Sequence, residues 1–232
     1  MRHLAIAVLV GGLAITAARS ASKQEERLQQ AQEVFQEIMD TPDKGIPQEL
    51  LERSVCIGII PSVKKFALGF GGRHGSGYVL CRKNNGKGPW GPPSGFSMSG
   101  GSFGLQLGFS ATDFVLLFMG QDGMEKLLQD KFTLGGDASV AGGPVGRSAS
   151  AATDAQMTAK ILAYSRSKGL FAGISLEGAV LRPSGDDNKE LYGRKVSPKE
   201  LLLEGRVEPP ASARPLIQTL DKYSSAQTKK PL

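Results

Sequence analysis

The residues of this chain that are best suited to bind a ligand are basic. Six of them lie in or beside turn-forming, Gly-rich segments: Lys64, Lys65, Arg73, Arg147, Arg166 and Lys168. Several turns at one end of a sheet would bring such residues together into a rim that attracts anions. Near an anionic membrane, each Lys or Arg contributes about 1 kcal/mol. The alternative is ordinary solubilising charge spread over the surface.

One serine has the spacing of a hydrolase nucleophile. Ser102 is the centre of a G-x-S-x-G pattern at residues 100–104. In an esterase this pattern forms a sharp turn between a strand and a helix, and the catalytic histidine comes after the serine. Here the following residues, LQLGFSATDFVLLF, have the composition of strands, and His74 precedes Ser102. We therefore predict no catalytic residue and no enzymatic activity, and we interpret the glycines as part of a bent strand.

Two other patterns do not predict a cofactor or a metal. Residues 86–91 have the spacing of a dinucleotide-binding loop, but Pro89 and the prolines that follow prevent a helix from starting there. Asp186, Asp187 and Asn188 could contact Ca²⁺, although the other ligands of an EF-hand are absent and a solvated turn explains them. With 2 Cys and 2 His in the chain, a zinc site is not expected.

The first residues have the pattern of a secretory signal peptide. Arg2 and His3 precede an apolar run at residues 4–18, and Ala18 and Ser20 supply the small residues of a cleavage site. The apolar run is about 15 residues long, which is shorter than the ~20 of a spanning helix. We expect residues 1–20 to be removed and the protein to be exported, periplasmic or extracellular. An uncleaved anchor is the alternative.

Export would place Cys56 and Cys81 in an oxidising compartment, where they could form a disulfide. Two buried thiols are the alternative, because free cysteine often behaves as a small apolar residue. Trp90, in a loop rich in Gly and Pro, could insert at a membrane interface. We expect it instead to fold back over the core.

The charge of the chain is modest. Arg2 and Arg19 leave with the signal peptide, so 26 of the 28 basic residues remain against 22 acidic ones, and the formal charge falls from +6 to +4. Nucleic-acid binders carry a stronger excess, and we expect no nucleic-acid partner.

The order of the expected elements predicts an α+β fold. Apolar spacing favours a helix over residues 23–40. Strand-like segments fill the middle of the chain, two of them joined by a turn at 167–169, and 184–190 reads as a polar loop. Short helices are expected up to residue 54, from about 197, and over 210–223. This order indicates an antiparallel sheet flanked by N- and C-terminal helices, and its glycines allow it to be strongly bent or barrel-like.

Four blocks of the sequence resemble the SYLF-domain family. They are GIIPSVKKFALGFGGRHGSGYVL, PWGPPSGFSMSGGSFGLQLG, FTLGGDASVAGGPVGRSASAATDA, and AYSRSKGLFAGISLEGAVL followed by N-x-x-x-YG at 188–193. The resemblance covers about residues 25–205 and implies a lipid- or phosphoinositide-binding module without established enzymatic activity. Some eukaryotic members bind actin and carry SH3 or FYVE domains. Because no such domain fits in this chain and a signal peptide is expected, we do not expect actin as a partner.

The expected organisation is a signal peptide at 1–20, a SYLF-like domain at 21–205, and a C-terminal helix with a flexible tail at 206–232. We predict a non-enzymatic protein of the cell envelope that binds anionic membrane lipid peripherally through its basic turns. The helix at 23–40 has an acidic polar face, which anionic lipid would repel, so we expect it to pack on the sheet. The alternatives are an apolar pocket that holds an acyl chain, and a structural module with an envelope protein as its partner.

Overall fold

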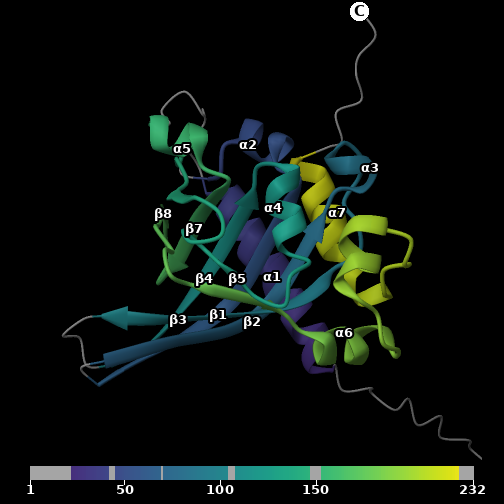
Figure 1. The fold of residues 1–232 in the computed structure, drawn as a ribbon, viewed down its shortest axis with the longest axis horizontal. Helices are drawn as coiled ribbons and strands as arrows, with labels where there is room; N and C mark the ends of the chain where they lie inside the picture. Colours follow the sequence, from purple (N-terminus) through teal and green to yellow (C-terminus); the bar gives the residue numbers. More distant parts are fainter. Residues whose placement is uncertain (1–21, 42–44, 69, 104–107, 147–152, 225–232) are drawn as a thin grey trace, which may run out of the picture.

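The computed structural model describes residues 22–41, 45–68, 70–103, 108–146 and 153–224 (Figure 1). The expected signal peptide and Arg147 lie outside these ranges. Among the helices of the described ranges, none is both long and apolar enough to cross a membrane.

The described strands form one nine-stranded sheet in the order β5-β9-β3-β2-β1-β4-β7-β6, with β8 also pairing with β7. The strands are β1 (Cys56–Leu68), β2 (Phe70–Cys81), β3 (Ser94–Phe103), β4 (Gly108–Phe118), β5 (Phe132–Thr133), β6 (Val140–Gly142), β7 (Ile161–Ser167), β8 (Leu170–Gly173) and β9 (Val180–Pro183). Every pair is antiparallel except β6 and β7. The sheet curls into a half-barrel with helices at both ends of the chain packed on it, which confirms the predicted α+β class.

The helices are mostly short. They are α1 (Lys23–Asp40), α2 (Gln48–Arg53), α3 (Lys83–Gly86), α4 (Gln121–Lys126), α5 (Asp154–Thr158), α6 (Gly185–Tyr192), a π-helical turn η2 (Lys199–Glu204), a 3-10 turn η3 (Ala211–Ala213) and α7 (Arg214–Tyr223). The polar loop expected at 184–190 is wrong, because these residues form α6. The Ser184 hydroxyl accepts a hydrogen bond from the Asp187 N–H, and acidic residues fill the first turn. Both features stabilise a helix start.

One face of the sheet is covered by α1 and α7. The apolar stripe of α1, including Leu28, Phe35 and Ile38, is buried in the same cluster as Ile57 and Ile59 of β1. A reciprocal capping box between Ser22 and Glu25 fixes the first turn of α1. As predicted, the acidic helix therefore packs on the sheet, with its Glu-rich face outward.

The opposite face holds a second core that includes the disulfide. Cys56 and Cys81 face each other on neighbouring strands, are buried, and are bonded to one another. Trp90 is 3% exposed, and its indole N–H donates to the Ser224 hydroxyl at 3.0 Å. The structure thus folds Trp90 over the core rather than presenting it to a membrane.

Candidate functional site

A bulge in β1 decides which basic residues meet. The register of β1 shifts between Ile60 and Val63, and Ser62 takes a left-handed backbone with φ 51°. The Ser62 N–H donates to Asp113 Oδ1 at 2.8 Å, which holds the bulge. Beyond the bulge, Lys65 lies directly opposite Arg73 of β2.

Lys65 and Arg73 line a pocket of about 290 Å³ on the face of the sheet that holds the second core. Its other lining residues are Val63, Ser110, Thr112, Phe114, Ser165, Ser167 and Ile174. They supply four hydroxyl groups and three apolar side chains, and no carboxylate is among them. Two cations and several hydroxyl donors suit an anionic oxyacid group such as a phosphate. The apolar part of the lining suits the carbon chain attached to it.

Arg166 does not join this pocket. It lies between Ser165 and Ser167 on β7 and therefore faces the other side of the sheet. There its Nε donates to Asp113 Oδ2 at 2.9 Å, and its guanidinium also forms an ion pair with Glu37 of α1. Burial lowers the pKa of Arg166 and raises that of Asp113. Arg166 thus joins α1, β4 and β7, and two carboxylates already neutralise its charge.

Two other predicted cations, Lys64 and Lys168, lie outside the pocket. Lys64 is exposed and pairs with His74, and strand alternation puts it on the face opposite Lys65. Lys168 is exposed in the β7–β8 turn, where Lys168 and Gly169 both have positive φ, as a two-residue type I′ hairpin requires. Of the five predicted residues that lie in the described ranges, the structure therefore brings together two, Lys65 and Arg73.

The hydroxyl groups of the pocket are the residues that sequence reasoning missed. Ser110 and Thr112 stand two positions apart on β4, and Ser165 and Ser167 stand two apart on β7. Residues at i and i+2 share a face of a strand. Paired hydroxyls at this spacing within two strand-like segments were the signal available in the sequence.

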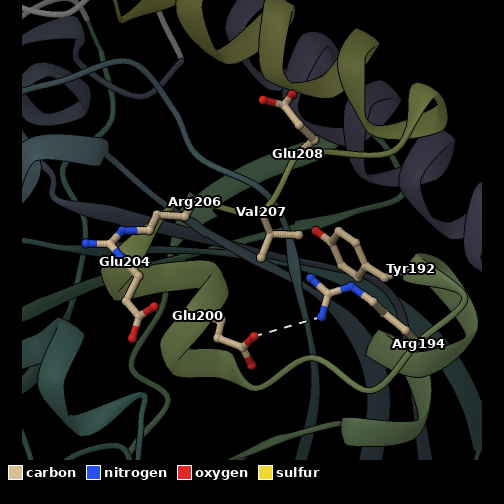
Figure 2. A pocket seen from close by; sticks show the side chains of 7 residues that line it. All are labelled: Tyr192, Arg194, Glu200, Glu204, Arg206, Val207 and Glu208. Carbon is tan, nitrogen blue, oxygen red and sulfur yellow. Dashed lines mark ion pairs between the residues drawn. The ribbon is translucent and has the colours of Figure 1, made fainter.

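A second pocket is larger but carries the wrong charge for an anion (Figure 2). It measures about 420 Å³ and is lined by Tyr192, Arg194, Glu200, Glu204, Arg206, Val207 and Glu208. Arg194 is paired with Glu200 at 3.9 Å. Hydrogen bonds from Ser197 lower the pKa of Glu200, so this carboxylate stays charged. Three carboxylates against two guanidinium groups make this pocket a poor site for an anionic headgroup.

The residues of the hydrolase-like and Ca²⁺-like sequence patterns have other roles in the structure. Ser102 lies within β3, opposite Gly71 of β2, and not at a strand-to-helix turn. Asn188 is buried, and its Oδ1 accepts from the Gly95 N–H at 2.7 Å. Asp187 pairs with Arg27 at 3.2 Å, so it joins α6 to α1. No group of three or more His, Cys, Asp or Glu residues within the described ranges is placed to hold a metal ion.

The described residues thus form an α+β domain built on one curled sheet, with a small pocket on one of its faces. The chain belongs to the Ysc84 (SYLF) family, whose model, described as "Las17-binding protein actin regulator", matches residues 99–223. This confirms the resemblance seen in the sequence.

Three relatives illustrate the similarity. "LAS seventeen-binding protein 3" of Saccharomyces cerevisiae is 39% identical over 182 residues, which cover 77% of this chain and 39% of that protein. "Protein YSC84" of the same yeast is 38% identical over 77% of this chain and 38% of its own length. The human "SH3 domain-containing YSC84-like protein 1" is 32% identical over 79% of this chain and 53% of its own. The chain thus matches between two fifths and about half of each relative.

These names correct one expectation. We did not expect actin as a partner, but the family is described as an actin regulator and yeast relatives are named for binding Las17. The expectation is wrong because it depended on the inferred compartment, which rests on residues outside the described ranges. The family description and the name of the first yeast relative refer to binding of Las17.

Proposed function

We propose that this protein binds anionic phospholipid or phosphoinositide-like headgroups, peripherally, through the pocket lined by Lys65 and Arg73. The observation that carries the proposal is that these two cations lie directly opposite each other on β1 and β2, and that four hydroxyl groups line the same pocket. Residues directly opposite each other in antiparallel strands have Cβ atoms about 4.5–5.5 Å apart, and like charges at that distance repel. With no carboxylate in the lining, a bound phosphate group would relieve this repulsion.

Vesicle flotation tests the proposal. We expect binding to phosphatidylcholine vesicles that contain phosphatidic acid or a phosphoinositide, but not to phosphatidylcholine alone. Lys65→Glu with Arg73→Glu removes two attractions and adds two repulsions, about 4 kcal/mol at ~1 kcal/mol per charge, or close to a thousandfold in affinity. Equal binding by this variant and the wild type would refute the proposal.

The control is a second double reversal with the same change in total charge. Lys195 and Lys199 are exposed, are neighbours in sequence of Arg194 and Glu200 in the second pocket, and are not among the residues that line the pocket of Lys65 and Arg73. Lys195→Glu with Lys199→Glu should leave flotation nearly unchanged. If it weakened binding as much as the pocket variant, bulk charge rather than the pocket would be responsible.

A second candidate function comes from the comparisons. The names of the family and of the yeast relatives favour an actin-linked protein partner. Co-sedimentation with actin filaments tests this directly. Saturable co-sedimentation without any vesicle binding would replace the lipid proposal with this one.

We also propose that the protein is exported and that residues 1–20 are removed. The basic start, the apolar run and the small residues at 18 and 20 support this. The Cys56–Cys81 bond suits an oxidising compartment. Mass spectrometry of the protein from its native host should find a mature chain that starts near Ala21. An intact Met1 would refute the proposal.

A further inference from the structure

The bulge in β1 decides whether Lys64 or Lys65 faces the pocket. Neighbouring positions of a strand face opposite ways, so only one of these two lysines can lie on the face that also holds Arg73. An extra residue in a strand turns every later side chain of that strand to the other face. If β1 took up its extra residue beyond Lys65, the pocket would contain Lys64 instead. The residues that fix the bulge ahead of these lysines therefore determine the composition of the pocket.

On the β4 side, the bulge is held by a single carboxylate. Two residues of β1, Pro61 and Ser62, lie opposite one residue of β4, Asp113. Pro61 has no N–H to donate, and the N–H of Ser62 donates to Asp113 Oδ1 at 2.8 Å. Ser62 has a φ of 51°, a left-handed conformation that is disfavoured for a residue other than glycine. The bulge therefore needs a contact that stabilises it, and the Asp113 carboxylate provides that contact.

Asp113 holds the bulge from behind the pocket. It alternates with Thr112 and Phe114, which line the pocket, so its side chain lies on the face that α1 covers. There its Oδ2 accepts a hydrogen bond from Arg166 Nε at 2.9 Å, and Arg166 also pairs with Glu37 of α1. These contacts fix the carboxylate beside the bulge and match its charge on that face of the sheet. The negative charge of Asp113 is therefore directed away from the cations of the pocket.

On the β2 side, two glycines make room for the bulge. A Cβ added to Gly77 would lie 2.1 Å from the Ile59 carbonyl oxygen, and one added to Gly75 would lie 2.6 Å from Val63 Cγ2. Both distances are shorter than a van der Waals contact, so β1 approaches β2 this closely because both positions are glycine. The bulge is thus accommodated by β2 and held by β4, at the position that brings Lys65 into the pocket.

We propose that Asp113 is the positioning residue of this anion-binding pocket. By holding the bulge at Ser62, it selects Lys65 rather than Lys64 as the lysine that contacts the ligand. This inference rests on the proposed function, since it concerns the same pocket. Asp113 itself does not contact the ligand, because its side chain lies on the other face of the sheet. Its removal therefore changes which lysine contacts the ligand and leaves the charged residues of the lining in place.

Two lysine variants report which side chain contacts the ligand. The probe is dihexanoyl phosphatidic acid, a water-soluble lipid, and its affinity is measured by isothermal titration calorimetry. In the wild-type background, Lys65→Gln should lower the affinity about tenfold, the equivalent of one hydrogen bond to a charged group, and Lys64→Gln should leave it nearly unchanged. Asp113→Ala should by itself lower the affinity about tenfold, because Lys65 is no longer held on the face of the pocket. In that background, the two glutamine substitutions should have equal effects.

Asp187→Ala is the matched control. The Asp187 side chain is 17% exposed and pairs with Arg27 at 3.2 Å, and the Asp113 side chain is 15% exposed and pairs with Arg166 at 2.9 Å. Asp187 lies on α6 and takes no part in the bulge, so Asp187→Ala should keep the wild-type affinity and the difference between the lysine variants. Asp113→Asn should keep both as well, because an amide oxygen also accepts the Ser62 N–H.

A change at Ser62 perturbs the bulge without altering Asp113. Ser62→Val puts a β-branched residue at a φ of 51°, where such residues are strongly disfavoured, and Ser62→Gly suits that conformation. Ser62 is exposed, so neither change affects the core. Ser62→Val should remove the difference between the lysine variants, and Ser62→Gly should keep it.

The outcomes separate the positioning role from the proposed function. Persistence of the lysine difference in Asp113→Ala, or in Ser62→Val should Asp113→Ala not fold, would overturn the positioning role and leave the proposed function standing. An equal loss of that difference in Asp187→Ala would do the same. A wild type that binds neither the probe nor anionic vesicles would overturn both.

Discussion

Arg82 is the side chain whose removal we expect to destabilise the fold most clearly. It is 3% exposed. Its guanidinium donates to the carbonyl oxygens of Ser54 at 3.2 Å, Gly88 at 3.3 Å, Leu51 at 3.4 Å and Ser224 at 2.7 Å. It also lies 4.3 Å from the centre of the Trp90 ring. One cation thus joins α2, the β2–β3 connection and the end of α7.

Arg82→Met keeps most of the apolar stem but removes every one of these donors. Each buried carbonyl that loses its partner costs about 1–3 kcal/mol. Part of this cost in stability is offset, because the variant no longer has to desolvate a buried charge. The same desolvation lowers the pKa of Arg82 in the wild type. Breaking buried charged interactions costs about 3–5 kcal/mol in other proteins, and we expect a loss of about 4 kcal/mol in the free energy of unfolding.

Urea unfolding measured by Trp90 fluorescence is the assay, because the reporting ring touches the mutated side chain. With a slope of about 2 kcal/mol per molar, the unfolding midpoint should fall by about 2 M. Arg182→Met is the control, since Arg182 is exposed on β9 and should change stability by under ~0.5 kcal/mol. A loss below about 1 kcal/mol in Arg82→Met, or an equal loss in both variants, would show that the network contributes little.

Three further outcomes are expected. The buried Tyr164 hydroxyl has no hydrogen-bond partner among the described residues, so Tyr164→Phe should raise the free energy of unfolding by about 1 kcal/mol; a lower unfolding midpoint would contradict this. Reduction of the Cys56–Cys81 bond, which spans 25 residues, should lower that free energy by about 3.5 kcal/mol, as seen in urea melts with and without reductant; coincident curves would refute it. Vesicle binding through Lys65 and Arg73 should weaken between 0.1 M and 1 M salt, as the screening length falls from about 10 Å to about 3 Å. Flotation that is insensitive to salt would favour an acyl-chain pocket without a headgroup contact.

The local elements could be predicted from the sequence because their signals are local. The helix over 23–40 follows from apolar spacing, and its start is fixed by Ser22 and Glu25, three residues apart. The turn at 167–169 carries a glycine where positive φ is needed. The failure at α6 has a local cause as well, since Ser184 and the two aspartates after it are a helix start that was interpreted as a polar loop.

The pocket could not be predicted from the sequence, because one bulge in β1 reverses which of the residues after it face the pocket. Ile60 belongs to the core that includes the disulfide, and strict alternation would place Lys64 on that face of the sheet too. The extra residue at Ser62 shifts the strand by one position, so Lys65 takes that place. Arg166 misses the pocket for a different reason: it alternates with Ser165 and Ser167 on β7, and its partner on the other face, Glu37, is far away in the sequence.

The packing of α1 limits where a membrane could be contacted. Its apolar residues, Leu28, Ala31, Val34, Phe35 and Ile38, are each at most 3% exposed. Four of these are large, and each contributes about 1.5–3 kcal/mol through burial. Lifting α1 from the sheet to insert it into lipid would therefore cost on the order of 10 kcal/mol before any membrane contact formed. It would also present the glutamates of its outer face to anionic headgroups. We therefore expect α1 to stay packed on the sheet when the protein binds a membrane, so that any contact with lipid is made by other parts of the surface.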